Sequence, residues 1–302
     1  MKRFAHQSGQ SMVITLVFVV VLIAIAGAVI DVGSWYRAHR QMQATADASA
    51  LAGAQELPES TGAALTRALD YADRNDGGVQ SQDVEFSASV VPNDSIKVTA
   101  RKPAPGVFTK LFGIDSVTAR ATAKARAGTL SSAKWAAPIG VDEQHPDLQC
   151  QPLPCFGNPT TLELDKVGPG SFKIINIDGS RGGTSSDTLG VWIDKGLDGY
   201  MPLDWYWGEP GSSFNASHVR DALESHLVSG EELLFPIFRE VRGGGSNFQY
   251  EVVGWVGWHL TGYEIGGKGE LNGWFTRVIW EGIESETATE DDFGVRSISL
   301  VE

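Results

Sequence analysis

Apolar residues are concentrated in one uninterrupted run near the amino terminus. Met12 to Ile30 comprises 19 residues without a charge, and Thr15 is its one polar side chain. A bilayer core of ~30 Å is spanned by about 20 residues at ~1.5 Å rise each. A cleaved signal peptide is the alternative, but its apolar region is usually only ~7–15 residues long. No A-x-A site precedes a polar start, so the pattern predicts an uncleaved transmembrane helix.

Small residues continue the helical pattern beyond the apolar run. Ala46, Ala50 and Ala54 recur at intervals of four, and alanine has the highest helix propensity. Small residues on one helix face allow a second backbone to approach closely. A solvent-exposed alanine-rich helix is the alternative, and Tyr36 favours packing against a partner. A helix over residues 10–56 would be about 70 Å long, which predicts a pilin-like stalk above the membrane.

The next residues, 57–128, read as a small α/β module. Thr61 is predicted to cap a helix that ends at Arg74, and Ala64, Leu65, Leu69 and Ala72 form its apolar face. Alternation and turn residues predict the remaining elements, which are strands over 84–91, 95–101 and 116–126 and a short helix over 107–112.

Residues 129–302 are rich in tryptophan and glycine and predict a mainly antiparallel β domain with short helices. The expected strands cover 171–177, 232–240, 248–260 and 270–280, and the expected helices cover 186–195 and 215–228. In the strand over 248–260, Val252, Val256, Trp258 and Leu260 would share one face, with Val253 and Trp255 on the other. Apolar residues on both faces predict a central strand. The whole chain is therefore expected to be α+β, with residues 1–9 as a tail.

Charge is distributed unevenly along the 302 residues. The net charge is −13, and residues 1–40 carry four basic groups and one acid, so the remainder carries −16. An acidic domain argues against nucleic acid as a partner, because phosphate binding needs a basic face. Lys2 and Arg3 precede the apolar run, which predicts a cytoplasmic amino terminus and an exported remainder of a single-pass inner-membrane protein.

Two cysteines, Cys150 and Cys155, form a C-x4-C pair. Outside the cytosol such a pair can form a local disulfide. A metal site with His145 as third ligand is the rival, but zinc sites usually show a second pair of ligands. The disulfide is the favoured state, and two free thiols are a third possibility.

No motif for catalysis is present. The chain lacks G-x-S-x-G, H-E-x-x-H, Walker A and Rossmann glycine patterns, and its six histidines are scattered. We therefore expect no enzyme activity, no cofactor, no metal and no small-molecule substrate. Aspartates among glycines could bind Ca²⁺, but they miss the EF-hand spacing and are common in turns; they are Asp178, Asp187, Asp194 and Asp198.

The aromatic triplet Trp205, Tyr206 and Trp207 is a candidate ligand surface. Aromatic platforms can stack on sugars or anchor protein interfaces. Core filling is the simpler interpretation for most of the tryptophans, whereas this triplet is expected in a proline- and glycine-rich loop.

The run DVGSWYRAHRQMQATADASALAGA, which starts at Asp31, resembles the amino-terminal segment of TadG-like Flp pilus-assembly proteins. The matching positions are Asp31, Gly33, Tyr36, Arg40, Gln43, Ala46, Asp47, Ala48, Ala50, Leu51, Ala52, Gly53 and Ala54. The resemblance implies a membrane-anchored accessory component of a Flp/Tad pilus apparatus, whose helix packs against other Tad proteins or pilin-like subunits. The helix-packing residues expected from it are Asp31, Gly33, Tyr36, Gln43, Ala46, Asp47, Ala50, Gly53 and Ala54.

One position departs from the pilin-like pattern. Relatives are cleaved after a glycine that is followed, at the fifth position, by a glutamate. Gly9 fits the glycine, but Ile14 stands where the glutamate would be, which favours a retained anchor.

The alternative function is a surface-anchored module that binds glycan or protein through exposed aromatic residues.

Overall fold

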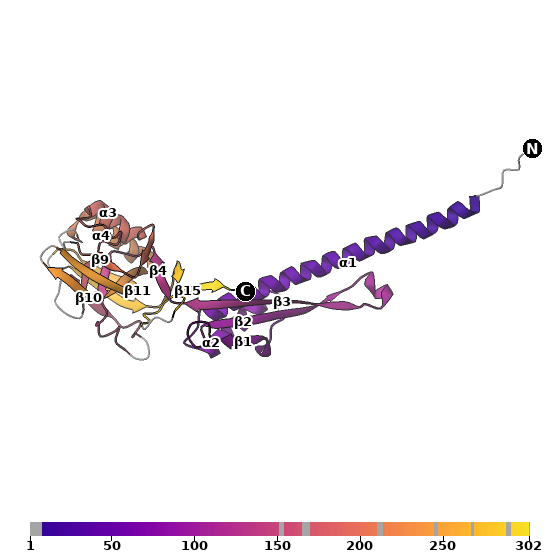
Figure 1. The fold of residues 1–302 in the computed structure, drawn as a ribbon, viewed down its shortest axis with the longest axis horizontal. Coiled ribbons are helices and arrows are strands. Elements are labelled where there is room, and N and C mark those ends of the chain that lie inside the picture. Colours follow the sequence, from indigo (N-terminus) through magenta and orange to yellow (C-terminus); the bar gives the residue numbers. More distant parts are fainter. Residues whose placement is uncertain are drawn as a thin grey trace, which may run out of the picture. The chain divides into compact units, whose positions relative to one another are not determined.

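The computed structural model describes residues 8–150, 154–164, 170–209, 214–244, 247–266, 269–287 and 291–301 (Figure 1). It divides into two units, of which the first is Met1–Arg126 with Ser299–Glu302 and the second is Ala127–Ile298. Most of the predicted tail, residues 1–7, lies outside the described residues. The chain is α+β, with one long apolar helix in the first unit and a mostly β second unit.

Helix α1, Ser8–Ala54, contains the whole apolar run and the alanine-rich segment without a break. Its side chains from Met12 to Ile30 are almost all exposed, with a mean hydropathy of 3.2 in the most apolar window. Among the described residues it is the one helix long and apolar enough to cross a membrane. An apolar helix whose described side chains are almost all exposed suggests membrane anchoring, because exposure of so large an apolar surface to water is unfavourable.

Helix α2, Thr61–Arg74, packs against the carboxyl-terminal part of α1 through small residues. Ala64, Ala68 and Ala72 are buried on α2. Its N-cap is Ser60, whose hydroxyl accepts the Ala63 N–H, so the prediction of Thr61 as the cap is wrong by one residue. Both residue types can cap, and the extended backbone at Ser60 decides between them.

Two antiparallel ladders complete the first unit. The 3₁₀ turn η1, Ser81–Asp83, leads into β1, Val84–Ser87, which pairs with β2, Ser95–Pro105. Strand β2 pairs without interruption with β3, Ser116–Gly128, and the turn η2, Thr109–Phe112, lies at the tip of this hairpin. Figure 1 shows the long β2–β3 hairpin running beside α1 toward its apolar half.

Six strands of the second unit form a closed ring of ladders. The order is β10 (Leu233–Gly244), β5 (Ile139–Asp142), β7 (Ser171–Ile174), β6 (Thr160–Leu164), β12 (Glu270–Thr276) and β11 (Asn247–Glu264), and β11 pairs again with β10. The main core is formed by residues of this ring, including Phe172, Phe235, Trp258 and Phe275, together with apolar residues of two helices. These helices are α3, Ser186–Lys195, and α4, Ser217–Ser229.

Shorter strands lie outside the ring. They are β9 (Trp205–Trp207) beside β11, the sheet of β14 (Gly282–Glu284), β4 (Leu130–Lys134) and β8 (Tyr200–Pro202), and the parallel pair β13 (Val278–Ile279) and β15 (Val295–Leu300). A second core cluster involves these strands and contains Tyr206 and Trp255.

The alternation predicted for β11 is wrong at Val252 and also at Val253, which packs against the main core and not with Trp255. Val256, Trp258 and Leu260 pack in the main core, whereas Val252 packs in the second cluster with Trp255. The register with β10 shifts between Ile237 and Phe238, which pair with Gly254 and Val252. A bulge adds a residue to one strand and reverses the faces that follow, so period-two reasoning fails across it.

Candidate functional site

Asp31, the first charged residue after the apolar run, is held by the tip of the β2–β3 hairpin. Its carboxylate accepts the backbone N–H groups of Val107, Phe108 and Thr109 at 2.9, 2.9 and 2.7 Å. The residue is fully buried by this loop. Three charge-assisted hydrogen bonds satisfy the carboxylate where α1 leaves its apolar stretch. The hairpin tip is thereby tied to the helix.

A second contact lies one helical turn away, inside the apolar stretch. Gly27 is buried, and a Cβ at this position would lie 2.5 Å from the Phe108 ring. Only glycine leaves room for that ring, so Gly27 and Asp31 form a matched pair of sites for the hairpin on one face of α1.

Most of the predicted helix-packing residues are buried or half-buried by other parts of the first unit. Ala46, Ala50 and Ala54 are fully buried, and a Cβ at Gly53 would lie 2.6 Å from the Ile96 side chain. Gln43 and Asp47 are half-buried and joined by a 2.7 Å hydrogen bond. The small residues of α1 thus pack against α2 and β2 of the same chain.

Gly33 and Tyr36 differ from this group. Tyr36 is 65% exposed, and a Cβ at Gly33 would meet no atom within 4 Å. Arg40 is also exposed, and spacings of three and four residues place it on the same side of the helix as Tyr36. The expected packing positions therefore divide between an intramolecular face and an exposed one.

This segment matches a known family. Residues 9–56 match the model of the Flp pilus-assembly TadE/G-like family, Tad. The match confirms the resemblance seen in the sequence and supports involvement in Flp/Tad pilus assembly. No curated protein and no solved structure matches the chain significantly. The TadE/G-like segment comprises the apolar stretch, Asp31 and the alanine-rich part of α1.

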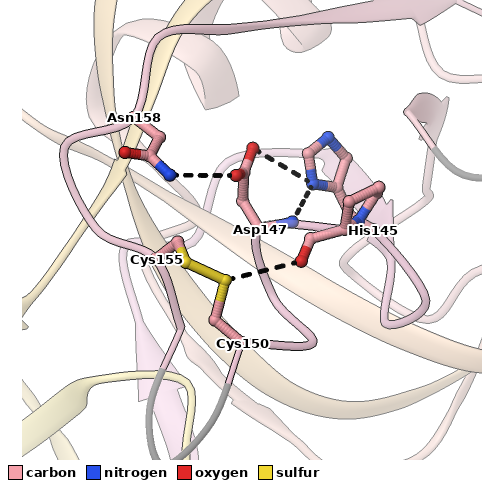
Figure 2. The surroundings of a disulfide bond; sticks show 6 residues. His145, Asp147, Cys150, Cys155 and Asn158 are labelled. Carbon is pink, nitrogen blue, oxygen red and sulfur yellow. Dashed lines mark hydrogen bonds and ion pairs between the residues drawn. A yellow bond between two sulfur atoms is a disulfide. The ribbon is translucent and has the colours of Figure 1, made fainter.

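The second unit contains a disulfide between Cys150 and Cys155, with Cα atoms 5.5 Å apart (Figure 2). Cys155 donates its N–H to the Asp147 carbonyl at 2.7 Å, and Asn158 donates to the Asp147 carboxylate at 3.3 Å. Three residues inside the disulfide loop, 151–153, lie outside the described residues. The bond closes a loop that is already hydrogen-bonded at Asp147.

His145, the ligand considered for a metal site, is buried beside this loop. Its Nδ1 lies 3.7 Å from the Asp147 carboxylate, and its ring packs edge-on against Phe275. Burial lowers the pKa of His145, although Asp147 and Asp142 act in the opposite direction. Within the described residues, no group of three histidine, cysteine or acidic side chains is arranged to hold a metal ion.

The aromatic triplet forms strand β9 on the edge of β11, so the expectation that it lies in a loop is wrong. Alternation along the strand buries Tyr206, whose hydroxyl donates to the Pro202 carbonyl at 2.7 Å. Burial, with a smaller effect of Asp204, raises the pKa of Tyr206 to about 12. Tyr206 is therefore a core residue.

Trp205 and Trp207 are half-buried on the opposite face of β9 from Tyr206. The Arg242 guanidinium lies 4.0 Å from the Trp205 ring, and Arg181 lies 5.0 Å from the Trp207 ring. Trp205 also lines a surface cavity of about 380 Å³ together with Leu203, Asp204, Arg239, Glu251, Val252, Val253 and Asp291.

The hairpin tip is the part of the site that sequence reasoning missed. The spacing of Asp31 from the loop, 76 residues to Val107, gives no local signal. A signal was nevertheless present, because the short segment Val107–Ile114 between two strands contains five large apolar residues.

Proposed function

We propose that this protein is a non-enzymatic, membrane-anchored accessory component of a Flp/Tad pilus-assembly apparatus. The observation that carries the proposal is the match of residues 9–56 to the TadE/G-like family, because this segment includes the exposed apolar stretch Met12–Ile30 of α1. Their amino-terminal end is cytoplasmic and the second unit is exported, in keeping with Lys2 and Arg3 before the apolar run.

The exposed face of α1 is the part of the TadE/G-like segment available to partners. Ala46 and Ala50 are occupied by the module of the same chain, whereas Gly33, Tyr36 and Arg40 are free of that packing. A tyrosine beside a glycine suits a helix–helix contact, because the glycine allows close approach and the ring fills the adjacent groove. The partners would be other Tad proteins or pilin-like subunits.

Deletion of the gene tests the proposal. A deletion strain should lack pili, and expression of the wild-type chain should restore them. Normal piliation of the deletion strain would contradict the proposal.

A pair of tyrosine variants then tests the exposed face. Tyr36→Ala should fail to restore pili while reaching wild-type levels in the membrane. Tyr200→Ala is the matched control, because Tyr200 is also exposed, at 51%, but lies in the second unit. Full piliation by both variants would show that Tyr36 makes no essential contact.

Binding of a glycan or protein by the second unit is the alternative function. The cavity beside Trp205 favours it, because an aromatic face bordered by Asp204 and Glu251 offers both stacking and hydrogen-bond acceptors for a sugar. A glycan array probed with the full chain in detergent tests this alternative. Saccharide binding that is lost in Trp205→Ala and kept in Trp207→Ala would favour it, because Trp207 does not line the cavity.

A further inference from the structure

The tip of the β2–β3 hairpin is apolar and exposed. Val107, Leu111, Phe112 and Ile114 have exposed fractions of 65, 83, 72 and 45%. A soluble loop rarely presents four large apolar side chains within eight residues, and such a patch indicates a surface that another apolar phase covers. Gly113, with φ of 81°, closes the turn η2 and keeps Leu111 and Phe112 at its end.

The tip lies beside the apolar stretch of α1. Phe108 packs on Gly27, which precedes Ile30 by three residues, or about 4.5 Å of helix. The backbone of the same loop is tied to Asp31 by three hydrogen bonds. When α1 spans a bilayer up to Ile30, the loop is therefore held at the depth where the apolar core begins.

We propose that the hairpin tip, residues 107–114, is inserted in the outer leaflet of the same bilayer that α1 spans. The inference rests on the proposed membrane anchoring. The lipid acyl chains cover Leu111, Phe112 and the neighbouring apolar side chains, as they cover Met12–Ile30. The protein thus has two membrane contacts, a spanning helix and a loop that enters from one side.

The polar groups of the tip suit this position. Lys110 is exposed between the apolar residues, and its long side chain can carry the ammonium group to lipid phosphates while its methylene groups stay in the apolar layer. The loop N–H groups that would otherwise be costly in lipid are bound by Asp31.

The two membrane contacts, the spanning helix and the inserted loop, would also fix how α1 leaves the membrane. A single helix can tilt and rotate freely, whereas a helix with a lipid-inserted loop on one face has a preferred rotation. That rotation would set the direction in which the exposed face with Tyr36 points.

Site-directed fluorescence in vesicles tests the insertion. Both native cysteines are in the disulfide, so a single introduced cysteine can carry a polarity-sensitive nitrobenzoxadiazole dye. The full chain is reconstituted into phosphatidylcholine–phosphatidylglycerol vesicles with the label at Leu111→Cys or, independently, at Phe112→Cys. Val21→Cys reports on the spanning helix, and Ser87→Cys reports on the far end of the hairpin, about 33 Å from the tip along β2.

We expect both tip labels to show blue-shifted emission, quenching by nitroxide lipids and protection from iodide, as for Val21→Cys, while Ser87→Cys shows the reverse. Iodide quenching of the tip labels as strong as that of Ser87→Cys, with Val21→Cys still in lipid, would overturn the insertion alone. A Val21→Cys label open to iodide would overturn the membrane anchoring as well. Tip labels protected from both quenchers would mean that protein covers the tip, which also overturns the proposal.

Discussion

At the scale of single residues, the first unit contains the same arrangement twice, a buried carboxylate that binds the backbone of a loop. Asp31 and Asp94 are both buried, and each carboxylate accepts three backbone N–H groups from a loop. Asp94 accepts those of residues 89–91 before β2, and Asp31 accepts those of residues 107–109 after it. Each end of β2 is therefore fixed by one carboxylate, and removal of either should loosen one loop.

Replacement of Asp31 by asparagine should release the hairpin tip. The amide has one oxygen and adds two N–H donors that face the loop N–H groups, so the three hydrogen bonds cannot all form. Amide hydrogen exchange of the full chain in detergent should become faster at residues 107–109 and stay unchanged in β1. Asp115→Asn is the control, since Asp115 is an exposed carboxylate of the same hairpin. Unchanged exchange in Asp31→Asn would show that the tip is held by other contacts.

The stability of the first unit should depend on the ionisation of Asp94. Burial alone raises the pKa of Asp94, but the N–H donors of its loop together outweigh it, and the pKa lies below its ordinary value of 3.8. The ionised group therefore stabilises the fold above pH 3.8, and this contribution is lost as the pH falls through the lower pKa of the folded state. The melting temperatures of wild type and Asp94→Asn should differ at pH 7 and converge below pH 3.8. A melting-temperature difference that stays constant from pH 7 to below pH 3.8 would refute the stabilising role of ionised Asp94.

At the scale of elements, periodicity predicted much of the secondary structure. The predicted helices over 61–74 and 186–195 are the α2 and α3 of the structure, because both have a clear apolar face and terminal capping residues. The strand over 95–101 was predicted too short, because its pairing with β3 continues over polar and proline residues to Pro105. Long-range pairing of this kind outweighs local propensity.

The partner of the alanine face could not be predicted from sequence. The spacing of Ala46, Ala50 and Ala54 indicates close helix packing but does not say which chain supplies the second helix. In the structure α2 of the same chain supplies it, and its own alanines complement the face. The link between Asp31 and residues 107–109 was equally hidden, since it joins distant segments through backbone atoms.

Replacement of Ala50 by leucine should destabilise the first unit without any partner present. Ala50 is fully buried, so added methylene groups would separate α1 from its neighbours and cost about 1–3 kcal/mol of unfolding free energy. Ala44→Leu is the matched control on the exposed side of α1, with an effect within about 0.5 kcal/mol. Urea unfolding of the full chain in detergent measures both. Equal stabilities would show that the face is open to solvent or to another protein.

At the scale of the whole molecule, the chain combines an apolar helix, a small module built around the helix's extension and a larger β unit that carries most of the acidic charge. The basic residues before the apolar anchor fit the proposed export of everything beyond Ile30. The disulfide lies in that remainder, so its redox state reports on the compartment.

The Cys150–Cys155 bond should form only when the chain is anchored and exported. Cells are quenched in acid, and free thiols are alkylated before denaturing mass spectrometry. The full chain should carry no alkyl group, whereas a variant that lacks residues 10–30 should stay in the reducing cytosol and carry two. The bond closes a five-residue separation and should contribute about 2 kcal/mol, so Cys150→Ser should lower the stability of the second unit by that amount. Two alkyl groups on the full chain would contradict both the disulfide and the export of this unit.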